Sequence, residues 1–155
     1  MAHIESNVRI KAPVEDVFQF VADWHNVEGF YDGVYDYDCV GDQECGDGAR
    51  FCCKVKSPVI GETAYTLEMT DFLPNRGWTM QSVQGPEFVE RWWFHAEPGW
   101  PRSMRITYDL QYKVPVPVPV IGGAIDALFV KPHWEGRVEK TLKNIRIMVE
   151  SKQTG

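Results

Sequence analysis

The chain has 155 residues, of which 44% are hydrophobic, 13% aromatic and 25% charged, and its formal net charge is −6 at pH 7. This composition is typical of a globular protein, excludes global disorder and, at this length, favours a single domain over residues 1–155. Residues 23–49 hold eight Asp or Glu and no Lys or Arg. Such a surface repels phosphate backbones and anionic lipid, so we expect no nucleic-acid partner.

The first predicted element is a half-buried strand. Residues 3–11 alternate, with Ile4, Val8 and Ile10 on one face and charged or polar residues on the other, which is the period of a β-strand. Pro13 then begins a helix, because proline at the first helical position loses no hydrogen bond. Apolar residues follow it at helical spacing, and residues 23–33 are expected to form a second short helix or tight turn.

Six further strand-like segments follow, separated by turn residues. They are Val34–Val40, Ala49–Lys56, Glu62–Phe72, Gly77–Val83, Glu87–Glu97 and Met104–Val114. Short connections between successive strands favour antiparallel pairing in a meander.

The last part of the chain is predicted to be helical. Alternating prolines make residues 114–120 an extended connector, since proline cannot donate to a sheet. A small-residue helical turn, Gly122–Phe129, precedes a longer helix from about Pro132. That helix carries an apolar stripe that must pack on the sheet: Trp134, Val138, Leu142, Ile145 and Val149.

This order resembles the START-like SRPBCC superfamily, the helix-grip fold. The resemblance rests on three segments: Ile10-Lys-Ala-Pro-Val-Glu-Asp-Val-Phe-Gln-Phe-Val-Ala-Asp23, Gly122-Gly123 and Leu142-Lys-Asn-Ile145. The chain looks most like the polyketide cyclase/dehydrase and coenzyme Q-binding branch. The resemblance implies an α+β fold in which a curved antiparallel sheet of about seven strands wraps round a long C-terminal helix, with two short helices after the first strand. It also implies a deep cavity between sheet and helix.

Strand alternation predicts which side chains face that cavity, because the more apolar phase of each strand faces inward. The ligand-binding candidates selected this way are Tyr35, Tyr37, Phe51, Tyr65, Leu67, Met69, Trp78, Met80, Trp92, Phe94, Met104, Tyr108 and Tyr112. Phe129, in an expected lid, and His133, at the start of the terminal helix, complete the set. Such a lining suits a flat or flexible hydrophobic ligand.

Glu90 is the candidate catalytic residue. A carboxylate on the apolar phase beside Trp92 is desolvated, and desolvation raises its pKa toward the range useful in acid–base catalysis. Two alternatives stay open: a structural role, in which Glu90 pairs with Arg91 or Arg105 near the rim, or a strand phase opposite to the one assumed, which would turn Glu90 outward.

No metal or cofactor site is expected. The four cysteines (Cys39, Cys45, Cys52 and Cys53) form no Cys-x-x-Cys pair, and no phosphate-binding glycine loop or dinucleotide fingerprint is present. Without a visible secretory signal, we expect reduced thiols and a cytoplasmic protein. The apolar segment 114–130 is too broken to span a bilayer, although transient membrane contact stays open.

These patterns leave three functional hypotheses. The first is a protein that binds a hydrophobic small molecule such as a lipid, quinone or polyketide. The second is a cyclase or dehydrase that folds a poly-carbonyl chain in the cavity and transfers protons with Glu90 or a tyrosine. The third is an interaction module whose acidic surface over residues 23–47 docks a basic protein partner.

Overall fold

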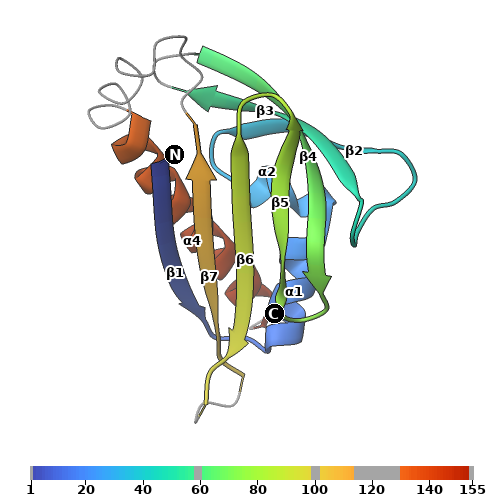
Figure 1. The fold of residues 1–155 in the computed structure, drawn as a ribbon. Helices are drawn as coiled ribbons and strands as arrows, with labels where there is room; N and C mark the ends of the chain where they lie inside the picture. The colour runs from blue at the N-terminus through green and yellow to red at the C-terminus, as the bar shows by residue number, and fades with distance from the viewer. Residues whose placement is uncertain (1, 58–60, 99–101, 114–129, 154–155) are drawn as a thin grey trace.

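The structure is a computed structural model that describes residues 2–57, 61–98, 102–113 and 130–153 (Figure 1). Its sheet has seven antiparallel strands in the order β1-β7-β6-β5-β4-β3-β2. The strands are β1 Ala2–Ile10, β2 Val34–Val40, β3 Arg50–Ser57, β4 Gly61–Leu73, β5 Gly77–Gln84, β6 Phe88–Ala96 and β7 Met104–Tyr112. The helices are α1 Val14–Ala22, the 3₁₀ turn η1 Trp24–Asn26, α2 Val27–Phe30 and α4 Lys131–Gln153.

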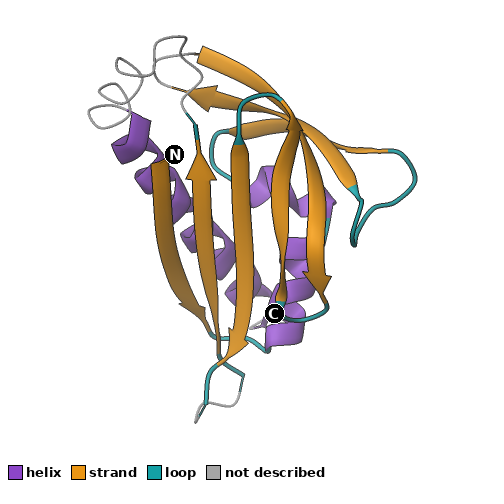
Figure 2. Cartoon of the chain, viewed as in Figure 1, coloured by secondary structure: helices purple, strands orange, loops and turns teal. Residues whose placement is uncertain are grey.

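The described helices lie on one side of the curved sheet, as Figures 1 and 2 show. The sheet does not close, because β1 and β2 form its two edges. The long helix α4 runs along the concave side, and α1 and α2 lie beside it. This arrangement confirms the predicted α+β helix-grip architecture. The predicted connector 114–120 and the helical turn Gly122–Phe129 lie outside the described residues.

The sequence patterns account for most of these elements. Helix α1 begins directly after Pro13, with Glu15 and Asp16 in its first turn, where the helix dipole favours negative charge. Strand β7 alternates between buried and half-buried side chains along its whole length, as a strand with one face on the core should. The predicted apolar stripe of α4, from Trp134 to Val149, is buried.

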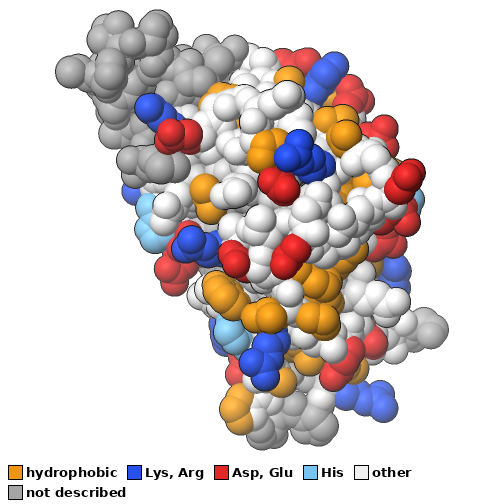
Figure 3. Space-filling view, turned by 45° about the vertical axis from the view of Figure 1, so that its right-hand side comes forward, with side chains coloured by type: hydrophobic (Ala, Val, Ile, Leu, Met, Phe, Trp, Pro, Cys, Tyr) orange, Lys and Arg blue, Asp and Glu red, His pale blue; other side chains and the backbone are white. Residues whose placement is uncertain are grey.

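The outward surface of the molecule carries both charged and apolar side chains. On the face drawn in Figure 3, acidic and basic side chains are interspersed with apolar ones. Leu73, Val83 and Trp93 are exposed large apolar side chains. Single exposed apolar residues are normal in folded proteins.

Strand β2 contains a bulge that corrects one prediction. The β2–β3 register shifts between Tyr35 and Asp38, and Asp36 lies there with a φ of 52°. The extra residue breaks the alternation, so Tyr35 shares the outer face with its cross-strand partner Lys54. The Tyr35 hydroxyl donates to exposed Glu62. The expectation that Tyr35 faces the cavity is therefore wrong.

Candidate functional site

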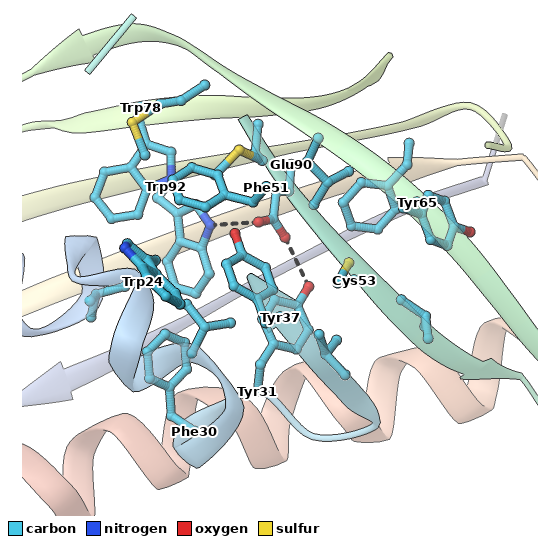
Figure 4. Close-up of a pocket in the computed structure, with 18 of the residues that line it drawn as sticks. Trp24, Phe30, Tyr31, Tyr37, Phe51, Cys53, Tyr65, Trp78, Glu90 and Trp92 are labelled. Carbon is cyan, nitrogen blue, oxygen red and sulfur yellow. Dashed lines mark hydrogen bonds between the residues drawn. The ribbon is translucent and has the colours of Figure 1, made fainter. Parts of the chain in front are cut away.

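A cavity lies between the concave face of the sheet and the helices (Figure 4). The cavity is narrow: its volume, measured as the space open to the centre of a water molecule, is only about 40 Å³. Strands β3 to β6 supply most of one wall, because every second side chain of each strand points inward. The predicted residues on this lining are Tyr37, Phe51, Tyr65, Leu67, Met69, Trp78, Met80, Glu90 and Trp92.

Four of the predicted inward residues are buried but do not line the cavity. Phe94 packs against Phe18 of α1, with ring centroids 5.1 Å apart. Met104 is fully buried, and the Tyr112 ring lies 5.8 Å from that of Trp134. Tyr108 is 1% exposed, and its hydroxyl donates to Glu90, which does line the cavity. Helix packing thus takes up part of the inward face of β6 and β7.

His133 does not belong to the lining either. Its side chain is exposed at the start of α4, whereas its neighbour Trp134 is buried and lines the cavity. A helix turns by about 100° per residue, so adjacent residues face different directions. Phe129 lies outside the described residues.

Several residues of the lining were not predicted, and most come from the short helical segment after α1. Trp24, Val27, Phe30 and Tyr31 all face the cavity. Their spacing of three or four residues is a helical apolar pattern, which would have identified them as one face of a short helix. Trp134 also lines the cavity, at the start of the buried stripe of α4.

Glu90 lies at the centre of a buried polar cluster. One carboxylate oxygen, Oε2, accepts hydrogen bonds from the Tyr31 hydroxyl at 2.8 Å and from the Tyr108 hydroxyl at 2.6 Å. The other oxygen, Oε1, accepts from Trp92 Nε1 at 3.1 Å. The two hydroxyls also contact each other. Glu90 is 5% exposed. It therefore does not lie at the rim, where it would pair with Arg91 or Arg105.

Sheet register explains how this cluster forms. Trp92 pairs with Tyr108 across β6 and β7, and Glu90 pairs with Leu110. Tyr108 is therefore diagonal to Glu90 on the same face, within reach of a long side chain. Trp92 lies two residues along β6 on that face. Tyr31 reaches the same carboxylate from the segment that follows α2 (Figure 4).

Burial changes the acidity of this cluster. It raises the pKa of Glu90 above its ordinary value, and the hydrogen bonds from Tyr108, Trp92 and Tyr31 oppose that rise. Burial, together with the nearby Glu90 charge, raises the pKa values of Tyr31 and Tyr108 well above 10. The two phenols therefore stay protonated, while the carboxyl can exchange a proton at a higher pH than an exposed glutamate.

Two hydrogen-bond donors on the lining have no partner among the described residues. Trp78 Nε1 is buried without an acceptor. Tyr37 stacks on Phe51 with ring centroids 5.5 Å apart and points into the cavity in Figure 4, and no described residue bonds its hydroxyl. Burial raises the pKa of Tyr37 well above 10, so it too is a donor. An unpaired buried donor costs about 1–3 kcal/mol, which applies to Trp78 Nε1, whereas the Tyr37 side chain is half-buried.

One group of potential metal ligands lies outside the cavity. His3, Glu5 and Asp109 bring their ligand atoms within 4.8 Å of one another. Glu5 and Asp109 pair across β1 and β7, and His3 Nε2 lies 2.5 Å from Asp109 Oδ2. His3 and Glu5 are exposed, and exposed groups of this kind pair readily without an ion.

None of the described helices combines the length and the apolar character that crossing a membrane requires.

Comparison with known protein families assigns the chain to one of them. The family described as polyketide cyclase/dehydrase and lipid transport matches residues 1–150. No curated protein sequence matches the chain.

Solved structures share the fold at low sequence identity. TTHA0849 from Thermus thermophilus is 19% identical with a TM-score of 0.79, over 97% of this chain and 99% of that one. The ZhuI aromatase/cyclase from Streptomyces sp. R1128 is 13% identical with a TM-score of 0.71, over 96% and 93%. The di-domain ARO/CYC BexL from the BE-7585A biosynthetic pathway is 15% identical with a TM-score of 0.68, over 96% and 50%.

Proposed function

This chain belongs to the polyketide cyclase/dehydrase and lipid transport family, and we propose that it binds a hydrophobic small molecule in the cavity beneath its sheet. The ligand is a lipid, quinone or polyketide-like compound that carries at least one carbonyl or similar acceptor. Family membership and the aromatase/cyclase neighbours support a hydrophobic ligand-binding or cyclase role.

The observation that carries this proposal is an apolar lining with unpaired donors. Aromatic rings, aliphatic groups and sulfur make up most of the wall, which favours an apolar ligand. Trp78 Nε1 and the Tyr37 hydroxyl lack acceptors within the described part of the chain. A ligand carbonyl that accepts from Trp78 Nε1 removes the penalty of leaving that buried donor unpaired, and one that accepts from the Tyr37 hydroxyl gains a hydrogen bond. The narrowness of the space favours a flat ligand or one that moves the lining as it binds.

Prodan, a neutral naphthyl ketone whose emission shifts on leaving water, tests the proposal. We expect saturable binding to the wild-type protein. Tyr37→Phe should weaken that binding about two- to tenfold, which corresponds to the loss of one hydrogen bond of about 0.5–1.5 kcal/mol. Tyr35→Phe is the matched control, because that tyrosine lies two residues earlier on the outer face. Absence of saturable binding, together with no apolar adduct in native mass spectra of the purified protein, would contradict the proposal.

A second function, a cyclase or dehydrase, is favoured by the Glu90 cluster. We infer that an ionised Glu90 removes a proton from an acidic carbon between two carbonyls, while a neighbouring hydroxyl donates to the enolate oxygen. Glu90 lines the cavity, and Tyr31 does so beside it. The two phenols remain protonated, so each is able to act as that donor.

Glu90→Gln separates the two functions. The amide keeps the size of the side chain but cannot accept a proton at neutral pH. A binding protein retains its prodan affinity within about threefold, since a neutral ligand gains little from the charge. An enzyme loses its turnover of a poly-β-carbonyl thioester, followed by the absorbance of the cyclised product. Retained turnover in Glu90→Gln would exclude Glu90 as the base.

A further inference from the structure

Trp24 separates the cavity from a hollow on the molecular surface. The indole and its neighbour Ala22 line both spaces. The hollow is also bordered by Glu15 of α1 and by Glu44 and Cys45 in the loop between β2 and β3. Trp24 is half-buried, and Figure 4 places it at the edge of the cavity. The large Trp24 side chain, together with Ala22, therefore forms the wall between the cavity and this part of the surface.

A second depression also touches the cavity lining but is closed by backbone. Cys53 and Tyr65 line both the cavity and a depression over β3 and β4. These two residues are cross-strand partners in the continuous β3–β4 ladder. A ligand passing there has to break sheet hydrogen bonds, whereas passage at Trp24 requires only that a side chain rotate. Rotation of a side chain is much faster than opening of a sheet.

The polar and ring contacts of Trp24 face solvent, while the rest of its indole packs against the hydrophobic core. Its Nε1 donates to Glu44 Oε1 at 3.1 Å, and its ring stacks on His25 with centroids 3.9 Å apart. Glu44 and His25 are both exposed. Water can replace the lost hydrogen bond when the indole swings out, so the main cost of opening is the lost packing of a half-buried ring.

The hollow also has a net negative lining. Its charged side chains are Glu15, Asp23 and Glu44, and no described Lys or Arg lines it. The Nδ1–H of His25 donates to Asp23 Oδ1 at 2.7 Å. Lys152 is near enough to influence Asp23 but does not border the hollow. Carboxylates at a concave mouth repel anions over about 8–10 Å at physiological salt.

We propose that ligands pass into the cavity through this hollow by displacing the Trp24 indole, and that its carboxylates favour neutral or cationic ligands over anionic ones. The proposal rests on the proposed function of the cavity as a ligand site. It narrows the class of ligand to apolar molecules without a free acid group and makes Trp24 the gate.

Stopped-flow fluorescence with N-phenyl-1-naphthylamine, a neutral apolar probe, tests the gate. Trp24→Ala should raise the association and dissociation rates together, by roughly tenfold, as expected when gating contacts limit passage. Trp24→Phe keeps a ring but loses the hydrogen bond, so its rates should rise by a smaller factor. Trp93→Ala, at an exposed tryptophan on β6, is the control and should leave both rates unchanged.

The stopped-flow measurement distinguishes failure of the gate from failure of the proposed function. A rise in the dissociation rate alone would show that Trp24 is only a ligand contact and would overturn the gate. Unchanged rates in both Trp24 variants, with normal equilibrium binding, would overturn the gate and leave the proposed function standing. Absence of saturable probe binding to the wild-type protein would overturn both.

An anionic probe, 1-anilinonaphthalene-8-sulfonate, tests the charge selection. Glu15→Gln removes one negative charge from the hollow and leaves the hydrogen bond between Trp24 and Glu44 in place. It should raise the association rate of the sulfonate about two- to threefold and leave that of the neutral probe unchanged. Glu139→Gln, on the exposed side of α4, is the matched control for net charge. Equal effects of Glu139→Gln and Glu15→Gln on the association rate of the sulfonate would overturn the charge selection.

Discussion

Glu90→Gln should remove a pH dependence of stability that the wild-type protein shows in weakly acidic solution. Burial raises the pKa of Glu90 in the folded protein, whereas in the unfolded chain it titrates near 4.5. Between these two pKa values the folded protein holds more protons than the unfolded chain. The free energy of unfolding therefore falls as pH rises through this window. Glutamine does not titrate, so the decrease due to this side chain should disappear.

The magnitude follows from the hydrogen bonds of the carboxylate. Each unit by which the folded pKa exceeds the unfolded one removes about 1.4 kcal/mol from the free energy of unfolding at higher pH. The bond from Tyr108, which opposes the rise most among the three, contributes about 1.5–3 kcal/mol when Glu90 is charged. Tyr108→Phe should cost about that much at pH 8, but only about 0.5–1.5 kcal/mol in a Glu90→Gln background.

Urea unfolding followed by tryptophan fluorescence, from pH 4 to pH 8, measures both effects. A double-mutant cycle between Glu90→Gln and Tyr108→Phe should give a coupling energy of about 1–2 kcal/mol at pH 8, above the 0.3–0.5 kcal/mol typical of independent sites. The coupling should shrink toward pH 4, where the carboxyl is protonated. Additive effects at pH 8, or an unchanged pH dependence in Glu90→Gln, would refute a buried, hydrogen-bonded carboxylate.

Three further variants or modifications test the packing around the site. Phe51→Ala, at a residue 1% exposed, should lower the free energy of unfolding by about 3–5 kcal/mol in urea titrations and admit larger ligands. Gly33→Ala should lower the free energy of unfolding more than Gly61→Ala. Both glycines have φ near +80°, but only at Gly33 would an added Cβ lie 2.3 Å from Arg137 Cζ. Equal unfolding midpoints of the two variants would contradict this contact. Burial raises the pKa of Cys53 to about 12, so mass spectrometry should show no iodoacetamide adduct there at pH 8 until the protein unfolds.

The elements of this fold could be predicted because their signals are local. Alternation located each strand to within about two residues of its observed bounds, and Pro13 marked the start of α1. Periodicity reports which face of an element is buried, irrespective of what covers it. The inward phase of β3 to β6 was therefore correct before any partner was known.

Local rules failed where the backbone or the packing departs from regularity. Asp36 adds one residue to β2 and turns Tyr35 outward, and nothing in an alternating run signals such a bulge. Phe94 and Met104 were placed on the correct face, but buried helix contacts and cavity lining share that face. Burial alone does not distinguish a residue that packs against a helix from one that lines the cavity.

The amino-acid pattern by itself determined the order of elements, the apolar character of the inner face and the placement of one carboxylate on it. Only the tertiary structure brought Tyr31 and Tyr108, which are 59 and 18 residues from Glu90 along the chain, to the same oxygen atom. It also made Trp24 a wall between cavity and surface. Period and propensity act over a few residues, whereas these contacts depend on strand register and on how the sheet curves round the helices.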